Sequence, residues 1–184
     1  MSGVDESRPF LPVSIAVMTV SDSRTEADDR SGDTLARLIA ADGHHVAARR
    51  ILRDEGPALV AALRGWIADP AVDCVIATGG TGVTGRDVTP EAFRQVFDKE
   101  IDGFGELFRW LSYQKIGTST MQSRAVGGVA EGTYLFALPG SPGACKDGWT
   151  GILRHQLDSR FRPCNLVELM PRLREHLGPA TGAA

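Results

Sequence analysis

The sequence lacks the excess of positive charge and the long apolar runs that mark nucleic-acid-binding and membrane proteins. Its 20 Lys and Arg residues stand against 23 Asp and Glu, a formal net charge of -3, so the basic footprint that nucleic-acid recognition requires is absent. No apolar run approaches the roughly 18 residues of a membrane span, and residues 1–12 lack the apolar region of a signal peptide. We therefore expect a cytoplasmic protein that binds neither nucleic acid nor membrane.

Cysteine is scarce as well, and the three that occur are far apart. Cys74, Cys145 and Cys164 form no Cys-x-x-Cys pair and no Cys/His cluster, which excludes a disulfide framework and a zinc site of the usual spacing. The four histidines fall on predicted helices, at a strand start or near a tail, so we propose no Ser/His/Asp triad. The chemistry of this chain must come from other residues.

What is present is an alternation of strand and helix patterns within a length suited to one domain. We expect one α/β domain over residues 12–176, with flexible tails at 1–11 and 177–184. Apolar, β-branched runs predict strands at 13–20, 45–52, 72–78 and 132–138. Helical patterns lie between and after them, at about 31–43, 57–67, 90–97, 104–113 and 145–157. Ser31 or Asp33 can cap the first helix. Such alternation predicts a mostly parallel sheet flanked by helices on both faces.

Two glycine-rich loops, residues 78–82 and 139–143, directly follow predicted strands. Ligands of parallel sheets bind outside the carboxyl ends of the strands, so both loops are expected at one shared site. Glycine allows a ligand to approach the backbone closely, and successive N–H groups form an anion-binding concavity. The first loop matches neither a Walker A motif nor a dinucleotide fingerprint. Its alternative interpretation is a tight turn without a ligand.

Charged and hydroxyl residues follow the other strand ends. Arg86 can pair with a phosphate or with Asp87, and Asp87 can hold Mg²⁺ or cap the next helix, although Thr89 is the better placed cap. Asp54 follows the second strand near the expected ligand edge, where a solvated loop is the alternative. Ser21 belongs to a polar turn that either donates hydroxyls to a phosphate or serves the turn alone.

Two further segments carry signals of their own. Residues 117–125 hold four hydroxyl side chains and one arginine, a composition that suits a polar, phosphate-bearing ligand. Residues 104–113 form an apolar, aromatic stretch on an expected helix. Such a stretch is typical either of the core or of a subunit interface, and the sequence does not separate the two.

Six of these segments in register resemble the MoaB/Mog family of molybdenum-cofactor biosynthesis proteins, and its MoaB branch most. The resemblance runs from about residue 12 to 170. The segments that carry it are Val-Ser-Asp-Ser (20–23), Thr-Gly-Gly-Thr-Gly (78–82), Arg-Asp-Val-Thr-Pro-Glu-Ala (86–92), Gly-Phe-Gly-Glu-Leu-Phe-Arg (103–109), Gly-Thr-Ser-Thr-Met-Gln-Ser-Arg-Ala (117–125) and Leu-Pro-Gly-Ser-Pro-Gly (138–143).

The resemblance implies a molybdopterin-binding fold and a homo-oligomer, either a trimer or a hexamer made of trimers. It also implies Mg²⁺-dependent transfer of AMP from ATP to the phosphate of molybdopterin, with release of pyrophosphate. The acidic residues of active members match Asp54 and Asp87, which the resemblance makes catalytic and metal-binding. The substrate-binding segments match Gly79, Gly80, Thr81, Gly82, Ser119, Ser123, Arg124, Pro139, Gly140 and Ser141.

Two rival functions remain at this stage. One is a carrier or scaffold that holds molybdopterin without adenylylating it, since phosphate binding does not require the carboxylates. The other is an unrelated nucleotide-binding α/β domain.

Overall fold

The computed structural model describes residues 2–175, and a six-stranded sheet of order β3-β2-β4-β7-β6-β5 forms its centre. The first four strands in this order are parallel, β6 is antiparallel to β7, and β5 is antiparallel to β6. The strands are β2 (Ser14–Val20), β3 (His45–Leu52), β4 (Cys74–Thr78), β5 (Lys99–Glu100), β6 (Val126–Ala130) and β7 (Thr133–Leu138). The predicted mostly parallel sheet is confirmed.

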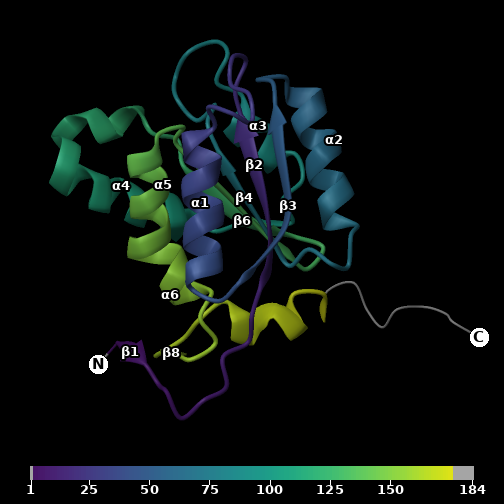
Figure 1. Cartoon of the computed structure of the whole chain (residues 1–184), viewed down its shortest axis with the longest axis vertical. Helices are drawn as coiled ribbons and strands as arrows, with labels where there is room; N and C mark the ends of the chain where they lie inside the picture. The colour runs from purple at the N-terminus through teal and green to yellow at the C-terminus, as the bar shows by residue number, and fades with distance from the viewer. Residues whose placement is uncertain (1, 176–184) are drawn as a thin grey trace, which may run out of the picture.

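Helices cover both faces of this sheet, as predicted (Figure 1). One face carries α1 (Arg30–Ala41), α4 (Asp102–Ile116) and α5 (Pro142–Gly148), and the other carries α2 (Gly56–Ile67) and α3 (Thr89–Arg94). Alternate residues of each central strand enter separate cores: Val17 packs on the α1 side and Met18 on the α2 side. Because both faces are buried, these strands read as continuous apolar runs.

The last predicted helix, 145–157, begins earlier than expected. α5 continues through a π-helical turn (Trp149–Leu153) into α6 (Arg154–Gln156). Ser141 starts it, because its hydroxyl accepts a hydrogen bond from the Ala144 N–H at 3.1 Å. The residue therefore caps a helix from within one of the glycine-rich loops.

Two predicted helix caps are wrong. The N-cap of α1 is Asp29, whose carboxylate accepts from the Gly32 N–H at 2.9 Å, rather than Ser31 or Asp33. Thr89 lies inside the first turn of α3, and its hydroxyl donates to the Gly79 carbonyl at 2.9 Å. In both cases a contact with a distant strand or loop outweighs the local capping preference.

The N-terminal segment, predicted as a flexible tail, lies against the domain. Gly3–Val4 (β1) pairs antiparallel with Phe161–Arg162 (β8), and the Phe10 ring lies 5.1 Å from that of His44. These partners are distant in sequence, so no local pattern indicates them. The predicted tail 177–184 lies outside the described residues.

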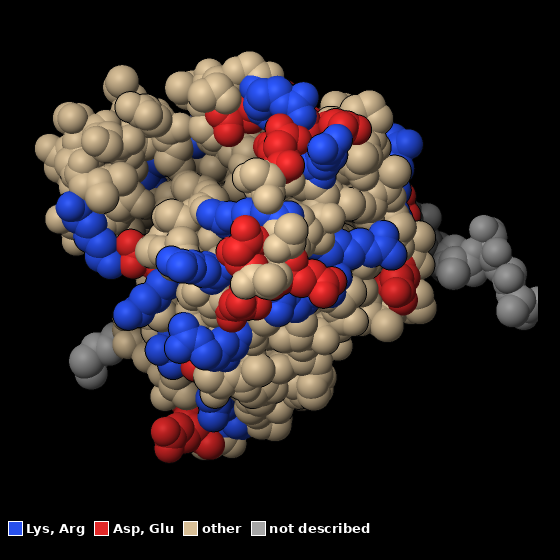
Figure 2. All heavy atoms as spheres, turned by 45° about the horizontal axis from the view of Figure 1, so that its top comes forward, with Lys and Arg blue, Asp and Glu red and all other residues tan. Residues whose placement is uncertain are grey.

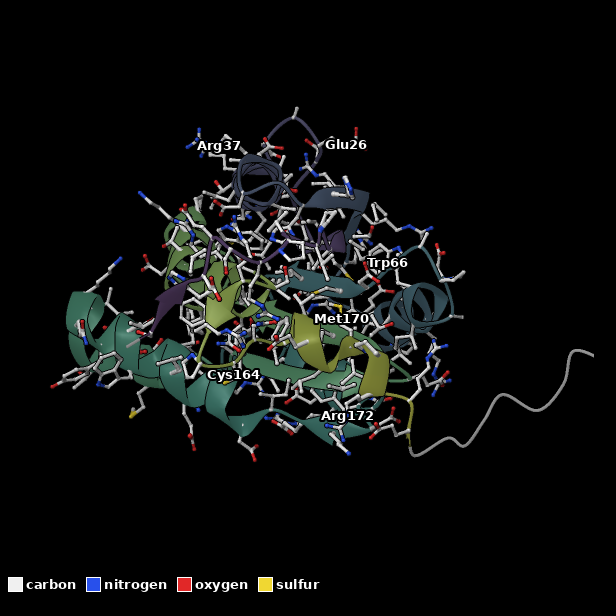
Figure 3. All side chains as sticks on the ribbon, turned by 90° about the horizontal axis from the view of Figure 1, so that it is seen from below. Glu26, Arg37, Trp66, Cys164, Met170 and Arg172 are labelled. Carbon is white, nitrogen blue, oxygen red and sulfur yellow. The ribbon has the colours of Figure 1, made fainter. Side chains whose placement is uncertain are left out.

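The underside of the molecule is formed by the C-terminal part of the described chain. Seen from below, the segment that carries Cys164, Met170 and Arg172 crosses the amino-terminal edge of the sheet (Figure 3). Its 3-10 helix η3 spans Val167–Arg172, and the Tyr134 hydroxyl of β7 donates to the Leu166 carbonyl at 2.9 Å. Within residues 2–175, no helix is long and apolar enough to cross a membrane.

Candidate functional site

A cavity of about 590 Å³ opens at the carboxyl ends of β2, β4 and β7. The loops that follow these strands form its floor, and α4 with the 3-10 helix η1 (Gly117–Gln122) forms one wall. Figure 2 views the molecule with this edge turned forward, and charged side chains gather at the centre of that view. The cavity is lined by all the predicted site residues except Arg124, namely Ser21, Asp54, Gly79, Gly80, Thr81, Gly82, Arg86, Asp87, Ser119, Ser123, Pro139, Gly140 and Ser141.

The two glycine-rich loops touch each other at the floor of the cavity. A Cβ atom on Gly140 would lie 3.1 Å from the Gly79 Cα, which is closer than most Cβ contacts, so glycine favours this approach. The Gly79 N–H donates to the Leu138 carbonyl, and the Thr78 hydroxyl donates to the Pro139 carbonyl, both at 3.0 Å. Gly79 and Gly80 have φ values of 105° and 62°, a region that favours glycine. The predicted shared site therefore exists as a geometric unit.

Asp54 and Asp87 both lie directly against the first glycine-rich loop. A Cβ on Gly80 would come within 2.6 Å of Asp54 Oδ1, and one on Gly82 within 2.8 Å of Asp87 Oδ2. Asp87 does not cap α3; its carboxylate accepts from the N–H and hydroxyl of Thr84 at 2.8 and 2.6 Å. Two strand ends thus bring two carboxylates to one loop.

The two carboxyl groups titrate differently. Burial raises the pKa of Asp54, and the nearby charges of Asp22 and Asp87 raise it further. Burial also raises the pKa of Asp87, but hydrogen bonds from Thr84 and the Gly82 backbone outweigh it, so this pKa lies below its usual value. Asp54 therefore carries an unfavourable negative charge, which a bound cation would relieve.

The donor set fits Mg²⁺ held together with a phosphate ligand. Among residues 2–175 no group of three or more His, Cys, Asp or Glu side chains could hold a metal alone. Mg²⁺, however, is commonly bound through one or two carboxylates plus substrate phosphates. Asp54 and Asp87, beside a loop of anion-binding geometry, provide that combination.

Arg86 does not pair with Asp87, one of its two predicted partners, and its contact with a phosphate stays a prediction. Its guanidinium binds Asp22 through Nε at 3.0 Å and Nη2 at 2.8 Å, not Asp87. Asp22 belongs to the turn after β2, and this turn is brought beside the 79–88 loop only by the sheet order. The sequence marked the turn as polar without indicating its partner.

Arg124 does not face the cavity. Its Nε donates to the Gly82 carbonyl at 2.6 Å, its Nη2 to the Asp87 carbonyl at 2.7 Å, and its Nη1 pairs with Glu91. The guanidinium therefore supports the glycine-rich loop from outside the cavity. A direct contact with a phosphate stays a prediction.

Arg24 lines the cavity and was missed by sequence reasoning. Its guanidinium donates to the Ser31 hydroxyl and the Gly140 carbonyl, each at 2.9 Å. It joins the start of α1 to the second glycine-rich loop. Its only sequence signal is that it is the first basic residue after a strand end.

The α4 wall gives the cavity an apolar side. Phe108 and Ile116 line it together with the hydroxyls of Ser112, Ser119 and Thr120. Carboxylates and backbone amides thus lie at one end, and aromatic and aliphatic carbon at the other. Such a cavity suits a small ligand that carries both a flat ring and a phosphate.

Fold and site together define an α/β protein with a cavity at the carboxyl edge of its sheet, whose lining suits a phosphorylated small molecule. Comparison with known proteins identifies the family within this class. The model of the family described as "Probable molybdopterin binding domain" matches residues 16–159. Molybdenum cofactor biosynthesis protein B of Escherichia coli K12 is 50% identical over 159 residues, which cover 86% of this chain and 94% of that protein.

Solved structures agree with this match. A crystal structure of molybdenum cofactor biosynthesis protein B has a TM-score of 0.82 and 37% identity, covering 91% of this chain and 99% of its own. The tungsten cofactor synthesizing protein MoaB from Pyrococcus furiosus has a TM-score of 0.70 and 37% identity, covering 77% and 90%. The chain belongs to the MoaB/Mog family, as its motifs predicted. Membership supports a role in molybdenum cofactor biosynthesis and removes the interpretation as an unrelated nucleotide-binding domain.

Proposed function

We propose that this protein binds molybdopterin and transfers AMP to it from MgATP. The observation that carries the proposal is the placement of Asp54 and Asp87 against the glycine-rich loop of one cavity. Binding of a phosphate alone would need only the loop. Two carboxylates at the same loop are explained when a divalent cation accompanies the phosphate.

In the proposed reaction, a phosphate oxygen of molybdopterin forms a bond to the α-phosphorus of ATP. The bond between the α- and β-phosphates breaks, and its electron pair leaves with pyrophosphate. Asp54 and Asp87 would hold Mg²⁺, and when bound it would supply positive charge that offsets the charge developing on the phosphates. The chain itself contributes positioning: loop amides of 79–82 hold a phosphate, and the apolar side of the cavity orients a ring.

The test is pyrophosphate release by pure protein incubated with ATP, Mg²⁺ and molybdopterin. The Asp87→Asn variant should lower transfer by roughly hundredfold or more, while molybdopterin binding, followed by its fluorescence or absorbance, stays measurable. Asp69→Asn serves as the control, because Asp69 lies outside the cavity and its carboxylate accepts from the Ala71 N–H in its own turn at 2.9 Å. Full turnover by Asp87→Asn would remove Asp87 from the mechanism.

The same assay addresses the second candidate, a carrier or scaffold. If the protein is a carrier or scaffold, the wild type, Asp87→Asn and Asp69→Asn should all bind molybdopterin with the same affinity. None of them should release pyrophosphate. The loops described above would serve a carrier or scaffold equally well, so the carboxylates decide between the two functions.

We further propose that copies of the chain assemble through α4. The exposure of the aromatic stretch supports this proposal: Phe104 and Phe108 are buried in the core, whereas Leu107, Trp110 and Tyr113 are 42%, 60% and 58% exposed. α4 and η1 project from the body in Figure 1, and the corresponding lobe at the upper left of Figure 2 carries few charges. Apolar surface of this kind is typical of contacts between proteins.

Light scattering tests the assembly. We expect a trimer or hexamer, and Trp110→Glu should shift it toward monomer because a charge would be buried in the contact. Leu169→Glu alters another exposed apolar residue, on η3 at the opposite edge of the sheet, and should leave the mass unchanged. Equal masses for wild type and Trp110→Glu would place the contact elsewhere.

A further inference from the structure

Asp22 connects three loops at the mouth of the cavity. It follows β2, which lies between β3 and β4 in the sheet. Its carboxylate binds Arg86 from the loop after β4, and its Oδ1 accepts from the Asp54 N–H, after β3, at 3.3 Å. Arg86 and Asp54 line the cavity, whereas Asp22 is not one of its lining residues. Asp22 therefore contacts cavity residues without facing the ligand space itself.

The pair between Asp22 and Arg86 is well aligned but exposed. Nε and Nη2 of the guanidinium reach both carboxylate oxygens at 2.8–3.0 Å. The side chains are 63% and 43% exposed, for Arg86 and Asp22 respectively. An ion pair in such contact with water contributes little to stability. A phosphate can meet the same guanidinium with equal geometry and more charge.

These contacts leave Arg86 with two competing partners. The carboxylate holds it on one side, and an anion seated on the 79–82 loop can reach it from the cavity. An anion that takes the Nε and Nη2 hydrogens of Arg86 displaces Asp22 from them, whereas a short anion that stops at the glycine-rich loop does not. The competition therefore acts on polyphosphate chains and not on single phosphates.

We propose that Asp22 is an intramolecular competitor for Arg86 that sets the affinity of the cavity for polyphosphate. In the absence of ligand, Asp22 holds the guanidinium. A polyphosphate displaces it, and Asp22 takes the guanidinium back when the anion leaves. The inference rests on the proposed function, in which ATP brings the polyphosphate and pyrophosphate must depart. Asp22 then favours the release of pyrophosphate, because its carboxylate competes with pyrophosphate for the Arg86 guanidinium.

Calorimetric titration with inorganic tripolyphosphate in the presence of Mg²⁺ tests the proposal. Asp22→Asn should lower the Kd by roughly two- to tenfold, because a weak competitor is removed. Arg86→Gln should raise the Kd. In the Arg86→Gln background the additional Asp22→Asn change should lower the Kd by a smaller factor than in the wild type, since the contested group is gone and only the change in charge remains. Orthophosphate binding should be the same in wild type and Asp22→Asn.

A matched control separates this mechanism from a change in net charge. Glu100 binds Arg94 through the same two nitrogens, at 2.8–3.2 Å, and neither residue lines this cavity. Glu100→Gln changes the charge by the same amount and should leave tripolyphosphate binding unaltered. Weaker binding by Asp22→Asn would overturn the proposal. So would an equal gain in the Arg86→Gln background or in Glu100→Gln, or an absence of tripolyphosphate binding in every variant.

The outcome is independent of the AMP-transfer assay. The expected pattern of tripolyphosphate affinities without any pyrophosphate release would refute the proposed function and retain the role of Asp22. Pyrophosphate release together with equal tripolyphosphate affinities in all variants would support the proposed function and refute the role of Asp22.

Discussion

At the scale of single residues, Gly80 shows most directly how the loop and the carboxylates depend on each other. Its φ of 62° is strained for any residue with a side chain. A Cβ there would collide with the Thr89 hydroxyl and come within 2.6 Å of Asp54 Oδ1. The absence of a side chain is thus what admits the Asp54 carboxylate to the loop.

Gly80→Ala should therefore lower both stability and ligand affinity. Backbone strain of this kind costs about 1–3 kcal/mol, and displacement of Asp54 should weaken tripolyphosphate binding in the presence of Mg²⁺. Gly85→Ala is the matched control, because a Cβ there meets no atom within 4 Å and its φ is not positive. Urea denaturation and the same calorimetric titration measure the two effects. Equal stability of the two variants would show that the loop relaxes around the methyl group.

Residue types at strand ends were readable from the sequence, but their contacts were not. The positions of Asp54, Asp87 and the glycines follow from where each strand stops. Which side chain faces which depends on the order of strands in the sheet. Arg86 illustrates the limit: its partner Asp22 is 64 residues away, and adjacency of β2 and β4 has no signal in either segment.

At the scale of elements, the start of α1 links the sheet to the cavity through buried Asp29, which is 1% exposed. Its carboxylate accepts from the Gly32 N–H at 2.9 Å and from the Thr19 hydroxyl of β2 at 2.8 Å. Two residues further along, the Ser31 hydroxyl donates to the Gly140 carbonyl at 3.1 Å. The cap therefore orients the helix end that supports the second glycine-rich loop.

Asp29→Ala should cost about 1–3 kcal/mol of unfolding free energy. Loss of an N-cap accounts for about 1 kcal/mol, and the buried Thr19 hydroxyl loses its acceptor. Asp33→Ala provides the comparison, because Asp33 also pairs with Arg49 but its side chain is 59% exposed; its effect should stay within about 1 kcal/mol. Urea denaturation measures both, and a larger loss for Asp33→Ala would contradict the capping role.

β6 is among the elements that the sequence did not predict. Gly127 and Gly128 occupy its centre, and glycine disfavours strands on local grounds. Here a Cβ on Gly127 would lie 2.7 Å from the Phe136 ring, and one on Gly128 would lie 2.5 Å from the Phe97 ring. The strand exists because two aromatic rings pack over it, which is tertiary information. The buried parallel strands, by contrast, could be predicted because their own sequences are apolar runs.

At the scale of the whole molecule, the edge opposite the cavity is held together around His44. This buried residue follows the C-terminal end of α1 and lies between the ring of Phe10 from the N-terminal segment and that of Trp149, at 5.1 and 5.8 Å. Its Nδ1 accepts a hydrogen bond from the Val13 N–H at 3.1 Å. An imidazole nitrogen that accepts a hydrogen bond carries no proton. This contact therefore requires the neutral form of His44.

Stability should therefore depend on pH through His44. Burial lowers the pKa of this imidazole, and Asp42 and Asp158 offset only part of that effect. The unfolded chain takes up a proton near pH 6.5, while the folded chain resists until a lower pH. The stabilising contribution of neutral His44 is thus present above about pH 6.5 and is lost as pH falls through the folded pKa.

Urea denaturation across pH 8 to 5 measures this dependence. His44→Gln keeps a hydrogen-bond acceptor but does not titrate, so its stability should fall less steeply below pH 6.5 than that of the wild type. His45→Gln removes the exposed neighbouring histidine and should follow the wild-type slope. Because the far edge is distinct from the cavity, tripolyphosphate affinity at pH 7.5 should be the same in all three proteins. Parallel stability curves for wild type and His44→Gln would contradict the assignment, because the neutral imidazole would then contribute no pH-dependent stability.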